Sequence, residues 1–137
     1  MKTLHETDFH AWLTDQIDLA KKNDFQNMDW KNLIEEMEDL GDHYHEAIES
    51  HLTIIFIHKL KHLMQPRECK SWDDSIHDGI FQIQKKISRH PSLKNYPRKV
   101  FYECYEDARR AASRQTEIDL RKFPKDCPWT FEEILGE

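Results

Sequence analysis

Glycine and proline are scarce in this sequence, with only 3 glycines and 5 prolines among 137 residues. A β sandwich or barrel needs many turns rich in these residues, so their scarcity favours helices. Long apolar runs are missing as well. The longest candidate, residues 52–57, is interrupted by Thr53 and is far shorter than the roughly 18 residues that a membrane-spanning helix needs. The composition predicts an all-α protein that does not enter a membrane.

Paired cysteines are also missing. The three cysteines, Cys69, Cys104 and Cys127, are odd in number and none of them forms a Cys-x-x-Cys pair. Neither a structural zinc site nor a disulfide framework can be built from this spacing. We therefore expect reduced thiols in a cytoplasmic protein.

Positive charge is in short supply, since 26 Asp and Glu residues outnumber 20 Lys and Arg residues and give a formal net charge of -6. Such a protein is poorly suited to bind DNA or an anionic membrane through its average field. What the chain does contain is 38% hydrophobic residues, enough for one packed core at this length. We expect a single helical domain over residues 1–137.

One long helix is the clearest feature of the apolar pattern. Asp29 is a good N-terminal cap, and apolar side chains then recur every three or four residues until Leu63. Pro66 cannot continue the helix. The pattern predicts a helix over about residues 30–64, with Gly41 as the place where a bend could occur.

Three further amphipathic helices and one short turn are predicted around it. Thr7 can cap the first helix, Ser71 can cap the third, and Thr130 with Glu133 forms a capping box for a final turn. Short connections between amphipathic helices are typical of antiparallel bundles. We expect an antiparallel four-helix bundle around the long helix, ending in a short helical turn. The predicted helices span residues 7–22, 30–64, 71–90 and 97–116.

A pair of histidines on the long helix could bind a metal. His58 and His62 are four residues apart, so both side chains lie on one face of the helix. The segment reads HKLKH and lacks the catalytic glutamate of an HExxH zinc site. A third ligand would have to come from elsewhere, with His77 and Cys69 as candidates. The alternative is that His58 is a hydrogen-bonded histidine at the edge of the core and His62 is solvated.

Catalytic signatures are otherwise missing. A di-iron bundle needs Glu-x-x-His pairs, whereas this chain has Asp42-x-x-His45 and Asp74-x-x-His77, whose shorter carboxylates do not suit that site. There is no GxSxG or P-loop motif. We assign no catalytic residue and no cofactor, and an enzyme is the less favoured reading.

Two clusters of charge could instead contact partners. Glu38 belongs to an acidic segment of the long helix, and it lies 20 residues, or about 30 Å of helix, from His58. The acidic segment could meet His58 and Lys61 across an antiparallel dimer, or within one molecule if the chain folds back near Gly41. We expect Glu38, Lys61 and Trp72 in an interaction surface. The basic stretch 109–125 suggests nucleic-acid binding as a third and weaker hypothesis, because aromatic residues are not interleaved with its charges.

Several segments, in the same order along nearly the whole chain, resemble a known family. They are residues 6–13 (ETDFHAWL), 33–41 (LIEEMEDLG), 58–61 (HKLK) with 65–66 and 71–72, 91–93 (PSL), 123–124 and 127–130 (CPWT). Together they resemble the bacterial family known as domain of unknown function 29. His62 departs from the family pattern, which often has an aromatic residue there.

The resemblance implies an all-helical fold in the bacterial cytoplasm and brings no established activity. Together with the missing catalytic signatures, it favours a small interaction or regulatory module. The expected partner is another protein or a second copy of the chain. Metal binding through His58 and His62 is the alternative function, and nucleic-acid binding is the third.

Overall fold

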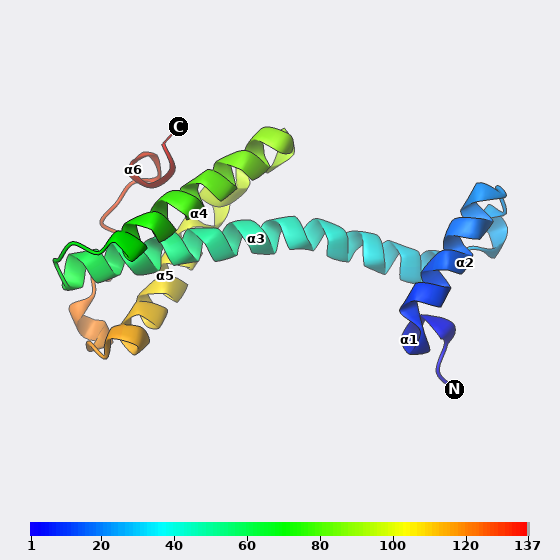
Figure 1. The fold of residues 1–137 in the computed structure, drawn as a ribbon, viewed down its shortest axis with the longest axis horizontal. Helices are drawn as coiled ribbons and strands as arrows, with labels where there is room; N and C mark the ends of the chain where they lie inside the picture. The colour runs from blue at the N-terminus through cyan, green and yellow to red at the C-terminus, as the bar shows by residue number, and fades with distance from the viewer. Residues whose placement is uncertain (137) are drawn as a thin grey trace. The chain divides into compact units, whose positions relative to one another are not determined.

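The computed structural model describes residues 1–136 and is helical throughout, without a β-strand in that part of the chain (Figure 1). The elements in chain order are α1 (Leu4–Thr7), α2 (Phe9–Lys21), η1 (Phe25–Asn27), α3 (Trp30–Met64), α4 (Lys70–Arg89), η2 (Pro91–Leu93), α5 (Tyr96–Thr116), η3 (Leu120–Lys122) and α6 (Phe131–Leu135). The predicted all-α class, with one long helix packed against others, is confirmed.

The long helix α3 has the bounds that the sequence predicts. Asp29 precedes its first turn and accepts a hydrogen bond from the backbone N–H of Asn32 at 3.4 Å, as an N-cap does. The helix ends at Met64, two residues before Pro66. It continues without a break through Gly41, around which a Cβ atom would meet no neighbour within 4 Å.

Two of the predicted caps are displaced by one or two residues. Asp8, and not Thr7, caps α2, because its carboxylate accepts from the backbone N–H of Ala11 at 3.0 Å while Thr7 belongs to α1. Helix α4 begins at Lys70 after Cys69, earlier than a cap at Ser71 would allow. Thr130 caps α6 as expected and accepts from the backbone N–H of Glu133 at 3.1 Å.

The contacts within the chain gather in two compact units, the N-terminal unit (Met1–Asp42) and the C-terminal unit (His43–Glu137). The first contains α1, α2, η1 and the beginning of α3. The second contains the rest of α3 and all later elements. The expectation of one folded domain stays a prediction, and each unit is described by itself below.

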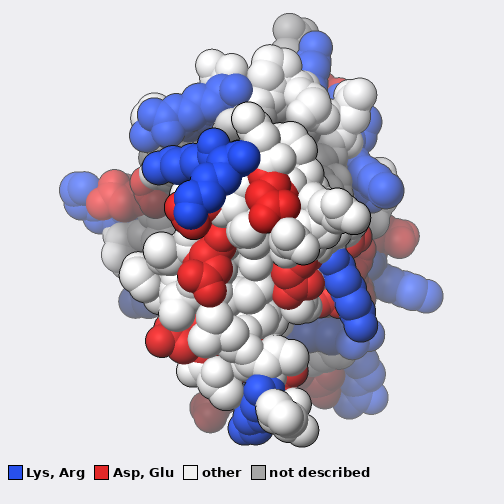
Figure 2. Space-filling model, turned by 90° about the vertical axis from the view of Figure 1, so that its right-hand side faces the viewer, with Lys and Arg blue, Asp and Glu red and all other residues white. Residues whose placement is uncertain are grey.

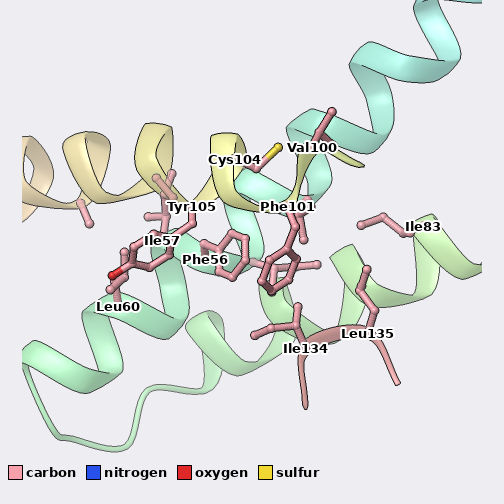
Figure 3. Packing of buried hydrophobic residues seen from close by; sticks show 14 of the residues in the cluster. Phe56, Ile57, Leu60, Ile83, Val100, Phe101, Cys104, Tyr105, Ile134 and Leu135 are labelled. Atoms are coloured by element: carbon pink, nitrogen blue, oxygen red, sulfur yellow. The ribbon is translucent and has the colours of Figure 1, made fainter. Parts of the chain in front are cut away.

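The C-terminal unit has a conventional hydrophobic core. Leu52, Ile55 and Phe56 of α3 are fully buried and pack against α5, where the rings of Phe56 and Phe101 meet edge to face at 5.0 Å. Figure 3 shows that α6 brings Ile134 and Leu135 to the same core, near Ile83 of α4. Four helices therefore share one apolar interior.

Small residues let the helices of this unit approach one another. At Gly79 of α4, an added Cβ atom would come within 2.7 Å of Ile55 Cγ1 on α3, which is closer than real Cβ contacts allow. On α5, Ala108 and Ala112 are fully buried, as their place on the predicted apolar stripe suggests. Close packing of α3, α4 and α5 thus depends on side chains of one methyl group or less.

Candidate interaction surface

The N-terminal unit is held together mainly by a polar cluster. The Trp12 indole donates a hydrogen bond to Asp29 Oδ2 at 2.9 Å, and the Gln16 side-chain oxygen accepts from the Asp29 backbone N–H at 2.7 Å. Asn32 also donates to Asp29 Oδ2, at 2.7 Å. Hydrogen bonds from Asn32 and Trp12 lower the pKa of the Asp29 carboxyl group. The carboxylate that caps α3 therefore also holds α2 against it.

A second contact ties α1 to α3. His5 Nε2 lies 2.9 Å from Glu36 Oε1, and the His5 ring packs edge-on against Trp12 at 4.5 Å. The earlier residue, His5, thus contacts the later residue of the α3 segment, Glu36, and the later residue, Trp12, contacts the earlier one, Asp29. Helix α1 therefore contacts α3 further along the chain than α2 does, and Figure 1 shows α2 crossing the beginning of α3.

These contacts bury very little of the N-terminal unit. Trp12 and Gln16 are its buried residues, with 4% and 7% of their surface exposed. Seven large apolar side chains of α2 and α3 remain between 38% and 63% exposed, and we call them the apolar stripe. They are Phe9, Leu13, Ile17, Trp30, Ile34, Met37 and Leu40.

Each half of the apolar stripe lies beside the contact between the two helices and not within it. On each helix, the stripe is rotated by roughly a quarter turn from the residues that face the other helix, at 3.6 residues per turn. The rotation has the same sense on both helices.

The apolar stripe is large enough for a protein interface. Seven side chains with about 100 Å² exposed each offer about 700 Å², close to the 800 Å² that one partner contributes to a standard interface. The largest apolar patch on a typical monomeric protein is about 300–600 Å². The stripe is therefore at least as large as the patches that mark interaction sites.

Two carboxylates of α3, Glu36 and Glu38, lie on either side of the stripe at helical spacing. Together with Glu35, Asp39 and Asp42, which lie on the opposite face of the helix, they line a shallow hollow of about 290 Å³. Figure 2, seen from the side on which α2 lies in Figure 1, shows uncharged surface with Asp and Glu side chains, and also Lys or Arg side chains, beside it. The predicted interaction residue Glu38 thus lies in an acidic region within the N-terminal unit.

The other two predicted interaction residues lie together in the C-terminal unit. The Lys61 ammonium group is 5.8 Å from the centre of the Trp72 ring, and the Arg67 guanidinium group is 4.8 Å from it. Both cations therefore stack on the same indole. The structure brings Lys61 and Trp72 into contact, while Glu38 belongs to the other unit.

The histidine pair on α3 has two different environments. Burial lowers the pKa of His58, with smaller contributions from the charges of Lys61 and His62, and this favours its neutral form. The buried His58 Nδ1 atom has no hydrogen-bond partner. His62 Nε2 lies 3.0 Å from Asp73 Oδ1, a distance suited to an ion pair, but the two groups are not aligned for a hydrogen bond.

The proposed third metal ligands are placed differently. His77 and His62 line one hollow of about 460 Å³ together with Asp73, Lys59 and Trp129. Cys69 Sγ instead contacts the hydroxyl group of Ser71 at 3.3 Å. Within residues 1–136, no three His, Cys, Asp or Glu side chains are arranged to hold one ion. Metal binding by His58 and His62 stays a prediction.

The basic stretch 109–125 is partly used within the fold. Arg109 donates to the carbonyl oxygen of Leu120 at 3.1 Å and pairs with Glu106, and Arg121 pairs with Asp119 at 2.8 Å. These two guanidinium groups are occupied by protein oxygens. Among the described residues, no helix is long and apolar enough to cross a membrane.

The signal for the apolar stripe was present in the sequence, since Phe9, Leu13 and Ile17 recur every four residues. The periodicity predicts an apolar face without indicating what covers it.

No curated protein and no solved structure matches the chain. The family model described as "Domain of unknown function DUF29" matches residues 4–137, and the chain therefore belongs to this family.

Proposed function

We propose that the chain is a protein-interaction module without catalytic activity, and that the apolar stripe of the N-terminal unit is its contact surface. One observation carries the proposal: this unit buries two residues and leaves the seven large apolar side chains of the stripe exposed. Exposed apolar area of this size is costly in water unless a partner covers it.

Several side chains that could perform chemistry have structural roles, which supports the non-catalytic reading. His45 stacks on Tyr96 at 4.1 Å, and His90 packs edge-on against Tyr44 at 4.6 Å. The Cys104 thiol is buried, and burial raises its pKa to about 11, so little thiolate forms at neutral pH.

The partner is another protein or a second copy of the chain, and the setting is the cytoplasm. The cytoplasmic setting is supported by Cys69, Cys104 and Cys127, all of which are free thiols in the structure. A regulatory role fits a small module that holds a partner without converting a substrate.

The proposal is tested by co-purification with the tagged chain from its native host. A double variant, Leu13→Asp with Met37→Asp, places charge on both halves of the stripe and should abolish capture of any partner. The matched control is Phe81→Asp with Tyr102→Asp, which alters two exposed aromatic residues of the C-terminal unit. Circular dichroism should show that both double variants keep the wild-type helix content, because all four positions are exposed.

A protein that copurifies with the wild type and the control, but not with the stripe variant, would support the proposal. Light scattering on the purified chain tests whether the partner is a second copy. A wild-type dimer that the stripe substitutions dissociate would also support the proposal. A chain that stays monomeric and captures the same proteins with and without the stripe substitutions would overturn it.

A further inference from the structure

We propose that the partner of the apolar stripe is a basic amphipathic helix of another protein. This inference rests on the proposed function and adds the chemistry of the partner. The supporting observation is the distribution of charge along the chain, because the net charge of the whole chain does not show that the two units differ in charge.

The net negative charge of the chain belongs to the N-terminal unit. Residues 1–42 contain 11 Asp and Glu, 4 Lys and no Arg, a net charge of -7. The remaining residues contain 15 Asp and Glu against 16 Lys and Arg, a net charge of +1. The apolar stripe therefore lies on the acidic unit, whereas the sequence of the C-terminal unit is close to neutral in net charge.

The carboxylates are positioned to contact whatever covers the stripe. On α3, Glu38 is four residues from Ile34 and Glu36 is four residues from Leu40, so each carboxylate neighbours a stripe residue on the helix surface. Glu36 also contacts His5 at 2.9 Å, whereas Glu38 is exposed. Of the four lysines, Lys22 is paired with Asp18 at 2.9 Å. A partner that covers the stripe would thus meet an apolar centre and an acidic border.

A helix is the form of partner that suits this surface. Two packed helices present a side on which another helix can lie, with its apolar residues spaced three and four apart. The stripe extends over nine residues of α2, about 12 Å, and eleven residues of α3, about 15 Å. A partner helix of about three turns matches this length. Lys and Arg beside its apolar face would reach the acidic border.

A second copy of the chain fits the surface less well. Pairing stripe against stripe would bring together two units that each carry a net charge of -7. Like charges facing each other across an interface oppose association, whereas opposite charges accelerate it and select the partner. The apolar area alone permits either partner, and the charge favours the basic one.

Three synthetic peptides of about 18 residues test this inference on the full-length chain. The first has leucines on one helical face and Lys and Arg on the other positions. The second keeps the leucines and replaces every Lys and Arg by Glu. The third has the composition of the first, with the order changed so that the leucines share no face. Binding is measured by fluorescence anisotropy of the labelled peptide at low and high salt.

We expect the first peptide to bind at micromolar concentration, and the second and third to bind at least about tenfold more weakly. Its binding should weaken as salt is added, because ions screen the border charges. Leu13→Ser and Met37→Ser should each weaken it, and Phe81→Ser should not. Glu38→Lys should weaken it more than Glu103→Lys, a matched exposed residue on α5.

The outcomes separate this inference from the proposed function. Equal binding of the basic and acidic peptides, abolished by Leu13→Ser, would overturn the basic partner and leave the docking role intact. The chain could instead bind no peptide and form a dimer that stripe substitutions dissociate. This result would identify a second copy as the occupant and would also overturn the basic partner. No binding of any peptide at about 100 µM to a monomeric chain would count against both proposals.

Discussion

The Trp12 indole donates a hydrogen bond to the carboxylate of Asp29, 17 residues further along the chain, at 2.9 Å. Asp29 is also the residue that precedes and caps α3. One carboxylate therefore performs a local task, capping a helix, and a tertiary one, holding α2. Because the N-terminal unit buries so little else, its stability should depend strongly on this pair.

Trp12→Phe should destabilise the N-terminal unit by about 2 kcal/mol, the value of a hydrogen bond to a charged group, since phenylalanine keeps the ring but loses the donor. Hydrogen exchange should show lower protection for the backbone amides of α2, with those of α5 unchanged. The matched control is Trp30→Phe, whose exposed indole donates to the carbonyl oxygen of Phe25. Equal loss of protection in both variants would contradict the role given to Asp29.

Acid should loosen the same unit. Hydrogen bonds lower the pKa of Asp29 below its ordinary value of 3.8, so the ionised carboxylate stabilises the folded form above that pH. This stabilisation is lost as the pH falls through the lowered pKa. We expect amide protection in α2 to decrease below about pH 4, and to decrease less in Asp29→Asn, which cannot titrate. An identical acid response of both proteins would refute the prediction.

Two glycine substitutions should change stability in opposite directions. Gly79→Ala places a Cβ atom 2.7 Å from Ile55 Cγ1. The overpacking cost of about 1–3 kcal/mol should exceed the gain in helix propensity of about 1 kcal/mol. Gly41→Ala adds a methyl group in open space and should stabilise α3 by about 0.5–1 kcal/mol. Urea unfolding measures both. A stabilised Gly79→Ala variant would show that α4 does not approach α3 so closely.

Thiol reactivity should differ sharply between two cysteines. The Ser71 hydroxyl group and backbone N–H groups lower the pKa of Cys69, whereas burial raises the pKa of Cys104 to about 11. Iodoacetamide at neutral pH should modify Cys69 first, as mass spectrometry of the digested protein would show. Cys69→Ser should remove the fast reaction. Early modification of Cys104 would mean that the core of the C-terminal unit opens readily.

The helices were predictable because their signals are local. Asp29, Pro66 and Thr130 act on residues within one turn, so their effect can be seen in the sequence. The prediction of the cap of α2 was wrong because two neighbouring residues carry the same local signal. Thr7 and Asp8 are both good caps, and the choice between them depends on α1, a single turn that the sequence pattern did not indicate.

The candidate surface was harder to predict because it depends on what covers a helix. Phe9, Leu13 and Ile17 form the expected periodic stripe, yet α3 packs beside them against Trp12 and Gln16. Nothing in the helical period distinguishes these neighbouring faces. The surroundings of His62 also come from residues distant in sequence, since Asp73 and Trp72 belong to α4.

The sparse interior of the N-terminal unit bears on how this sequence can diverge. Substitutions at Leu13, Ile17 or Met37 remove few contacts within the chain, so they should cost folding little while changing what the surface binds. Substitutions at Phe56 or Ile55 would disturb a filled core and be eliminated. Mutation can therefore alter the choice of partner in one unit while the other unit preserves the fold.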